Sequence, residues 1–415
     1  MRTEIKGASI RKVFTGRGDL TVEVELRLEG ASGRAIAPAG ASRGRHEVKY
    51  FPDEGVDASI DAFNRWVEPA LIGVDAGNQW LVDGKLEEVD GTEDFSRIGG
   101  AVAVATSLAA PVAVANELGL QPFQVIGGTL ANELPYPLGN VIGGGKHSRG
   151  LGPDFQEFLV LPYGARDIYT AVYANMEVHR EVGKLLAKED PTFAGGRNDE
   201  GAWTAKISTD KALKILTEAV KEVSGRLGIE VGIGIDAASS SMWNGKAYVY
   251  QNEGRELSPR EHFERIRRLI EDYNLIYVED PFHEEDFQSF AELTSLFKDR
   301  LIVGDDLFTT NAKRLEEGIR AGAANAVLVK VDQVGTLSRA METVRLAKAN
   351  GYRIVVSHRS GDTESGLLAH VAVGLNAPVI KAGVMGGERV AKANELLRIW
   401  SYLGKSARMA KLKFG

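Results

Sequence analysis

Apolar and polar residues alternate in the first third of the chain in a way that predicts strands followed by helices. The stretch LTVEVELRLEG alternates strictly, which is typical of a strand with one buried face and one wet face. We therefore expect antiparallel strands at 4–14 and 20–30, joined by the glycine-rich turn TGRGD. Helical periodicity follows at 56–72, 77–89 and 98–118. Together these elements predict a small α+β domain.

Further along, short apolar runs alternate with helical segments at a nearly constant spacing. After a strand-like stretch, FQEFLVLP, and helices expected at 166–188 and 209–227, the runs fall at 229–237, 275–279, 301–305, 326–331, 353–357 and 378–381. Strand–helix units of about 25 residues imply parallel strands with right-handed crossovers. The remaining length is close to the ~250 residues of a (β/α)8 barrel. We predict an α+β domain at 1–134 and a catalytic β/α barrel at 135–415, divided where two prolines interrupt NELPYPLGN.

The apolar runs of this repeat end in polar or charged residues. These are Asp236, Glu279, Asp305, Lys330, the trio His358, Arg359 and Ser360, and Lys381. The strand C-termini of such a barrel all open on one face, so the residues are expected to converge there. A lone lysine beyond a strand is more often one that reaches out to water. Three carboxylates and several cationic groups at neighbouring strand ends instead favour a metal-assisted active site.

The net charge, the cysteine content and the apolar stretches of the chain exclude several classes of function. The 415 residues carry a net charge of −7, which gives no electrostatic case for nucleic acid as a partner. The chain has no cysteine, which excludes disulfides and thiolate metal sites and fits a reducing, cytoplasmic compartment. We expect no signal peptide and no membrane span, since the most apolar stretch, 101–115, is interrupted by Pro111 and is typical of a buried helix.

The acidic strand ends suit a hard divalent cation. Asp236, Glu279 and Asp305 offer only oxygen ligands, which favours Mg²⁺ or Mn²⁺ over zinc. Asp280 and Asp306 stand directly beside two of these residues. Because side chains alternate along a strand, we expect only one residue of each acidic pair to face the centre.

Lys330 is the candidate base. Burial and a nearby cation both lower the pKa of a lysine, and a neutral lysine can remove a proton α to a carboxylate. Glu157 and Glu200 form a candidate acid pair, because two close carboxylates tend to share a proton. Arg359, Ser360 and the loop around Ser42 are suited to hold a phosphate. The reaction class that uses these parts is the β-elimination of water from a phosphorylated hydroxy acid.

The order of several motifs resembles the enolase family along nearly the whole chain. The motifs are AGASRGRHE, GGKH, FQEF, NDEG, IDAAS, VEDPF, VGDDLFTTN, LVKVDQVGTL, SHRSGDTE and IKAG with ERVAKANELLRI. The resemblance implies an enolase-type barrel behind a capping domain, and reversible dehydration of 2-phosphoglycerate to phosphoenolpyruvate. A lysine base acting with Mg²⁺ is established chemistry of that superfamily rather than an inference from this chain. The family also implies a homodimer or an assembly of dimers.

The resemblance implies a role for each matching residue. Lys330 would remove the C2 proton, and Glu200, supported by Glu157, would protonate the departing C3 hydroxyl. The first Mg²⁺ would be bound by Asp236, Glu279 and Asp305, and the second by Ser42 together with the substrate phosphate. The substrate-binding set would be Arg359 and Ser360 at the phosphate, Lys381 near the carboxylate, and Gln156, His147 and His358 along the pocket wall.

Several loops depart from the family pattern. The chain has TGRGDLT, NDEGAWTA, IDAASSS and MGG where the family usually has D-S-R-G-x-P-T, G-D-E-G-G-[FY]-A-P, an acid after D-x-A-A-S, and A-R-S. The residues expected to perform the chemistry all remain. The departures leave two alternatives open: a superfamily dehydratase acting on another acid, and a non-catalytic paralogue.

Overall fold

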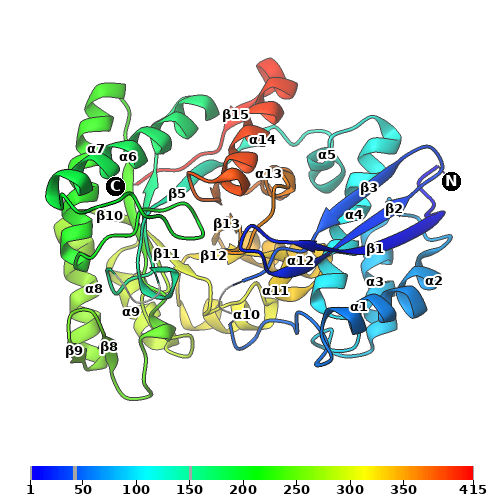
Figure 1. Cartoon of the computed structure of the whole chain (residues 1–415), viewed down its shortest axis with the longest axis horizontal. Coiled ribbons are helices and arrows are strands. Elements are labelled where there is room, and N and C mark those ends of the chain that lie inside the picture. Colours follow the sequence, from blue (N-terminus) through cyan, green and yellow to red (C-terminus); the bar gives the residue numbers. More distant parts are fainter. Residues whose placement is uncertain (1, 41–43, 149–151, 415) are drawn as a thin grey trace.

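The computed structural model describes residues 2–40, 44–148 and 152–414. Its first part is an antiparallel three-stranded sheet in the order β1–β2–β3, on which a long helix packs (Figure 1). The elements of this part are β1 (Gly7–Phe14), β2 (Leu20–Arg27), β3 (Ser32–Ile36), α1 (Val56–Ala62), α2 (Glu68–Leu71), α3 (Gln79–Asp90), α4 (Gly100–Leu118) and α5 (Pro122–Gly127). Both predicted strands and all three helical regions are confirmed. The short strand β3 was not predicted, because its five residues, SGRAI, are too few to show an alternating pattern.

Helix α4 is almost entirely enclosed. Within the described ranges it is the one helix that is long and apolar enough to cross a membrane, and 78% of its most apolar window is buried inside the protein. The small side chains of this helix allow close contact with β2 and β3.

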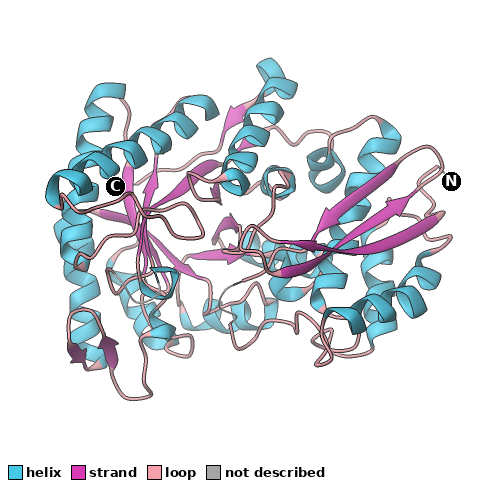
Figure 2. Ribbon diagram, viewed as in Figure 1, coloured by secondary structure: helices cyan, strands magenta, loops and turns pink. Residues whose placement is uncertain are grey.

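The second part is a closed eight-stranded barrel (Figure 2). Its strands are β5 (Tyr136–Gly143), β6 (Glu157–Leu161), β7 (Gly232–Asp236), β10 (Leu275–Glu279), β11 (Leu301–Gly304), β12 (Ala326–Val329), β13 (Arg353–Ser357) and β14 (Val379–Lys381). Its main helices are α6 (Ile168–Glu189), α7 (Thr209–Leu227), α8 (Pro259–Tyr273), α9 (Phe287–Leu296), α10 (Ala312–Ala321), α12 (Leu337–Ala349), α13 (Leu367–Gly374) and α14 (Gly387–Leu403). Strand β14 pairs with β5 and closes the ring.

One strand of the barrel runs against the others. Strand β6 pairs antiparallel with both β5 and β7, whereas the other neighbouring pairs are parallel. The chain therefore begins the barrel with two strands and two helices, β5, β6, α6 and α7, before the regular strand–helix repeat. A strict strand–helix alternation throughout the barrel would be wrong here. The reversal brings the beginning of β6, Glu157 with Gln156 just before it, to the same rim as the ends of the parallel strands.

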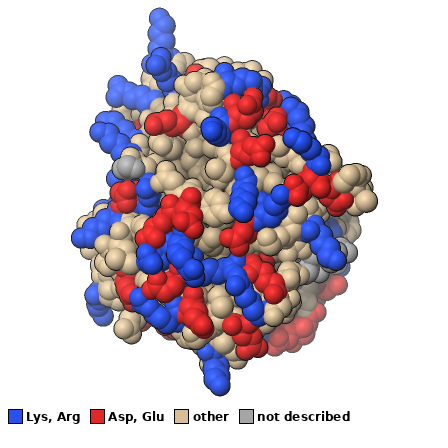
Figure 3. All heavy atoms as spheres, turned by 90° about the vertical axis from the view of Figure 1, so that its left-hand side faces the viewer, with Lys and Arg blue, Asp and Glu red and all other residues tan. Residues whose placement is uncertain are grey.

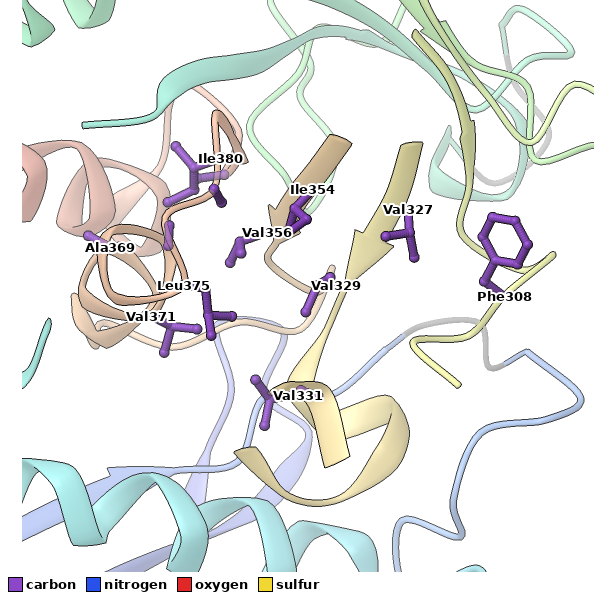
Figure 4. Close-up of a cluster of buried hydrophobic side chains, with 14 of the residues drawn as sticks. Phe308, Val327, Val329, Val331, Ile354, Val356, Ala369, Val371, Leu375 and Ile380 are labelled. Atoms are coloured by element: carbon purple, nitrogen blue, oxygen red, sulfur yellow. The ribbon is translucent and has the colours of Figure 1, made fainter. Parts of the chain in front are cut away.

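The barrel wall separates two apolar clusters. Alternate residues of β12 divide between them, with Leu328 inside the ring and Val327 and Val329 facing outward. Figure 4 shows the outer cluster, where Val329 of β12 and Val356 of β13 lie on the side of Val371 of α13, and Val327 lies beside Phe308. Continuous burial on both faces fixes the strand register, so the rim residues are held on a rigid support.

The two parts of the chain share buried hydrogen bonds at the beginning of α12. The N–H group of Ser338 donates to Asp83 Oδ2 at 2.9 Å, and that of Leu337 donates to Ser107 Oγ at 2.9 Å. Gln79 also donates to Asp83. Burial raises the pKa of Asp83, although these hydrogen bonds oppose the rise. Side chains from α3 and α4 thus satisfy N–H groups that the first turn of a helix leaves without intrahelical partners.

We expect Asp83→Ala to lower the free energy of unfolding by about 1–3 kcal/mol, because it leaves buried donors without an acceptor. Thermal and urea unfolding would measure the loss. Glu88→Ala is the matched control, since this exposed residue of α3 pairs only with Lys85 among the ion pairs of the described chain; it should cost less than about 1 kcal/mol. Equal losses in both variants would contradict the buried role of Asp83.

Basic and acidic side chains are interspersed on the barrel face seen in Figure 3. Many of them form ion pairs along the helices, as Arg260 does with Glu264 and Arg267 with Glu271 on α8. Such mixed surfaces produce no extended field of one sign.

Candidate active site

Most of the residues predicted for the site line one cavity at the rim of the barrel. The predicted residues in its wall are Gln156, Glu157, Glu200, Asp236, Asp305, Lys330, His358, Arg359, Ser360 and Lys381. Glu279 lies directly beneath, fully buried, and contacts Lys381. Ser42 and the side chain of His147 lie outside the described residues. Glu157 and Lys381, which are 224 positions apart in the sequence, therefore meet, as the converging strand ends predict.

Lys381 stands among three carboxylates. Its Nζ lies 3.0 Å from Asp236, 2.8 Å from Glu279 and 3.1 Å from Glu157. Burial disfavours the charged ammonium, but these three acids together raise the pKa of Lys381 well above its usual value. Burial and the charge of Asp236 raise the pKa of Glu279 to about 8. Tyr277 adds a 2.6 Å hydrogen bond to the same glutamate.

Lys330 pairs directly with Asp305. The ammonium donates to Asp305 Oδ2, and Gln333 donates to the other oxygen at 2.9 Å. Burial lowers the pKa of Lys330, yet the attraction of Asp305 outweighs it, and the pKa lies above its ordinary value. The expected lowering of the pKa counted burial and a nearby cation but omitted this ion pair, which opposes both effects. A cation that occupied Asp305 would weaken the pair.

The expectation that only one residue of each acidic pair faces the centre is also wrong. Asp280, Asp305 and Asp306 all line the cavity, and their carboxylate oxygens lie within 4.8 Å of one another. Strict alternation ends with the strands: β10 stops at Glu279, Asp280 has a φ of 41°, and β11 stops at Gly304. The VED and GDD sequences carried the only sequence signal for these extra acids.

Asp280 shapes the loop that carries the other two acids. Its oxygens accept the N–H groups of Asp305 at 2.9 Å and Asp306 at 2.8 Å. Burial and the charge of Asp306 raise the pKa of Asp280 well above its usual range. Asp280 therefore positions the ligand candidate Asp305 through its backbone.

The donor chemistry of this cavity fits a divalent cation. Its carboxylates are buried, they supply only oxygen, and they raise one another's pKa, which shows how much negative charge is concentrated there. Asp236, Glu279 and Asp305 contact lysines rather than apolar walls. Such a set of oxygen donors is suited to bind a hard divalent ion.

Glu200 reaches the cavity wall from the loop between α6 and α7. Asn140 donates to Glu200 Oε2 at 2.9 Å. Burial, with the charge of Glu200 as the second cause, raises the pKa of Glu157 well above its usual range. The two glutamates thus interact as a carboxylate pair, in which the charge of Glu200 disfavours ionisation of Glu157.

The Glu200 loop packs against another loop that departs from the family pattern. Asn198 accepts the N–H groups of Glu200 and Ala202 at 3.0 Å. Gly201 has a φ of 76°, and a Cβ at this position would lie 1.8 Å from the carbonyl oxygen of Met385. Two unusual stretches, NDEGAWTA and MGG, therefore contact each other and fix the position of Glu200.

We expect Gly201→Ala to destabilise the protein by at least about 1–2 kcal/mol, the cost of a left-handed backbone at a residue with a Cβ. The clash with Met385 also displaces Glu200, so kcat should fall. Melting temperature and dehydration rate would measure both effects. Gly225→Ala on α7 is the control, because its added Cβ meets nothing within 4 Å and its activity should stay unchanged. Normal activity of Gly201→Ala would contradict this packing.

Two acids not predicted from the sequence hold Arg359. Glu47 and Asp332 each lie 3.0 Å from its guanidinium. Although burial opposes the charge, Asp332 and Glu47 raise the pKa of Arg359 above its ordinary value. Burial also raises the pKa of Asp332 to about 6, despite the opposing effect of Arg359. Glu47 stands in the quoted motif AGASRGRHE, but its sequence gave no sign of a partner 312 residues away.

Comparisons with known proteins cover both parts of the chain. Residues 5–126 match the family model "Enolase, N-terminal domain", and residues 131–415 match "Enolase, C-terminal TIM barrel domain". An enolase of Pyrobaculum aerophilum is 62% identical over 99% of each chain. Enolases of Methanothermobacter thermautotrophicus, over 100% of each chain, and Archaeoglobus fulgidus, over 97% of this chain and 98% of the relative, are both 46% identical. Neither alternative, a dehydratase for another acid or a silent paralogue, gains support. Matches of this extent, with the acid and lysine cluster in place, show that the chain belongs to the enolase family.

Proposed function

We propose that this cavity interconverts 2-phosphoglycerate and phosphoenolpyruvate with Lys330 and Glu200 acting from opposite sides. The chain is a lyase of the enolase family, and its substrate is a small phosphorylated acid. The observation that carries the assignment of roles is one cavity lined by Lys330, by the Glu157–Glu200 pair and by Arg359. A base, an acid and a phosphate ligand are the parts that this elimination requires.

In the forward direction, Lys330 in its neutral form takes the C2 proton of the substrate. The electron pair of the C–H bond moves into the substrate carboxylate. The C3–O bond then breaks as Glu200, supported by Glu157, gives its proton to the leaving hydroxyl, so that water departs and a C2–C3 double bond remains. Lys330 returns its proton to solvent, and Glu200 takes one back. Each proton transfer needs a positioned donor or acceptor.

The remaining residues bind the substrate and the metal. Arg359 and Ser360 are proposed to hold the phosphate, Lys381 to face the carboxylate, and Gln156, His147 and His358 to line the pocket. The family is metal-dependent, and we propose Mg²⁺, with one ion at Asp236, Glu279 and Asp305 and a second at Ser42 with the substrate phosphate. Bound Mg²⁺ stabilises negative charge on the substrate carboxylate.

Removal of divalent cations should abolish the activity. We expect purified protein to form phosphoenolpyruvate from 2-phosphoglycerate with Mg²⁺, to lose this activity in EDTA, and to regain it when Mg²⁺ is added in excess. The rise in absorbance of the conjugated product measures the rate. Product formation at an unchanged rate in EDTA would refute metal dependence at this site, and absence of product under every condition would refute the function.

The oligomeric state, the cellular compartment and the domain boundary are further proposals. We propose a homodimer or an assembly of dimers in the cytoplasm, supported by the family relationship and by the absence of cysteine. We also propose that the capping domain comprises residues 1–134 and the catalytic barrel residues 135–415. That boundary is supported by the first barrel strand, β5, which begins at Tyr136.

A further inference from the structure

A fully buried arginine of α14 reaches beneath the loop that follows β13. The side chain of Arg389 is 1% exposed. Its guanidinium donates to the carbonyl oxygens of Arg359 at 2.8 Å, Ser360 at 2.6 Å and Asp199 at 3.1 Å. The same group lies 2.6 Å from Nδ1 of His358. Arg389 therefore connects the phosphate-side loop, the Glu200 loop and one imidazole of the cavity.

The contact with Arg389 determines where His358 carries its proton. A guanidinium has five N–H donors and no acceptor, so Nδ1 of His358 must be the acceptor. The ring proton then lies on Nε2. Because Arg389 excludes a proton from Nδ1, the ring stays neutral. The charges around the ring also favour its neutral form. Burial and the charge of Arg389 lower the pKa of His358 well below 6.5, and Lys381 and Lys392 lower it further. Glu200 is the acid that opposes this shift.

The other nitrogen of this imidazole faces the candidate acid. His358 is 4% exposed, and its Nε2 has no hydrogen-bond partner among the described residues. Glu200 Oε2 lies 3.8 Å away, slightly beyond hydrogen-bond distance. Contacts of this kind often tighten when a substrate closes the site.

We infer that Arg389 is a positioning residue, which fixes His358 as the neutral Nε2–H tautomer that faces Glu200. This inference rests on the proposed role of Glu200 as the acid. A neutral N–H donor stabilises the Glu200 carboxylate once its proton has left. A positively charged imidazolium would instead keep Glu200 ionised before the proton transfer to the leaving hydroxyl. Glu200 would then have no proton to give. Arg389 acts through His358 and is not among the described residues that line the cavity.

The tautomer can be read in the wild-type protein without any substrate. Nitrogen-15 NMR of histidine-labelled protein distinguishes a protonated ring nitrogen from an unprotonated one, and His358→Gln identifies the signal. We expect protonated Nε2 and unprotonated Nδ1 at neutral pH. A proton on Nδ1, alone or in an imidazolium, would overturn the inference. This result does not depend on activity, so a failure of the proposed function and a failure of the tautomer are distinguished.

Steady-state kinetics test whether the contact between Arg389 and His358 affects catalysis. Arg389→Met should lower kcat by about 10- to 100-fold, the usual effect of losing a partner that orients a histidine, with a smaller change in KM. It should also introduce an ionisation of His358 near neutral pH into the kcat profile. Arg389→Lys, which can still donate to Nδ1, should recover part of kcat and remove that ionisation.

Lys392→Met is the matched control for support of the same loop. Lys392 lies on the same helix and donates to the carbonyl oxygen of Thr363 at 2.6 Å, but it has no hydrogen bond to His358 among those of the described chain. Its variant keeps the Arg389 contact at Nδ1 and loses only a weaker charge effect on His358, so its pH profile should shift far less than that of Arg389→Met. If Arg389→Met changed KM alone, or if both variants changed kcat and its pH profile alike, Arg389 would be a structural support only and the inference would be wrong.

Discussion

Lys330→Ala should abolish exchange of the C2 proton of 2-phosphoglycerate with solvent. The substitution removes the only lysine of the cavity that pairs with Asp305 in the described structure, and with it the proposed base. A positioned base contributes about 10²- to 10⁴-fold to a rate, so both exchange and dehydration should fall at least that far. Exchange is measured by NMR in deuterated water, and dehydration by product absorbance. Both rates fall together because proton removal comes first.

The control for this variant is Lys348→Ala. Lys348 lies on α12 and donates to the carbonyl oxygen of Leu375, away from the cavity lining. Its loss should leave exchange unchanged. Circular dichroism should show that both variants retain their helices and strands. Exchange at the wild-type rate in Lys330→Ala would end the assignment of the base, whereas the metal site would stand.

Glu200→Gln should separate the two chemical steps. The amide has nearly the same shape as the acid, so Asn140 and the Asn198 turn still have a partner at this position. It has no proton to give to a leaving hydroxyl. We expect dehydration to fall by about 10²- to 10⁴-fold, while the C2 proton still exchanges, because Lys330 remains intact. The ratio of the exchange rate to the dehydration rate, measured in one sample, therefore rises steeply.

Glu177→Gln is the matched control for the loss of a carboxylate. Glu177 is 8% exposed on α6 and pairs with Arg180 and Arg226, so its substitution removes a similar buried charge outside the cavity. It should leave the ratio of exchange to dehydration unchanged. A Glu200→Gln enzyme that lost exchange and dehydration equally would show that Glu200 acts on binding or on the base, and not as the acid.

The parallel part of the barrel and most of its rim follow from the sequence. Apolar runs of four to six residues, repeated at regular intervals, require strands buried on both faces, and their ends must share one face. This local pattern is sufficient to place Asp236 and Lys330 in one cavity. The reversed strand β6 has the same apolar composition as its neighbours, so composition alone carries no information on its direction.

The contacts that shift the pKa values of the site residues and hold their side chains could not be predicted, because they join residues that are distant in the sequence. The pair of Lys330 with Asp305 opposes the expected lowering of the lysine pKa, and the two residues follow different strands, β12 and β11. Glu47 reaches Arg359 from the other domain. Asp280 was visible as an acid, but its role depends on a φ of 41° that ends the alternation. Patterns identify which residues reach the rim, and three-dimensional packing decides their partners.

The closure of the ring between β14 and β5 determines the order in which the chain can fold during synthesis. Val379 pairs with Tyr136, so the last strand meets a strand made far earlier. The N-terminal sheet and α4 are complete by residue 118 and can fold first. Until β14 leaves the ribosome, β5 and β13 both present open edges, which are templates for pairing with another chain. The growing polypeptide therefore carries an unfinished barrel through most of its translation.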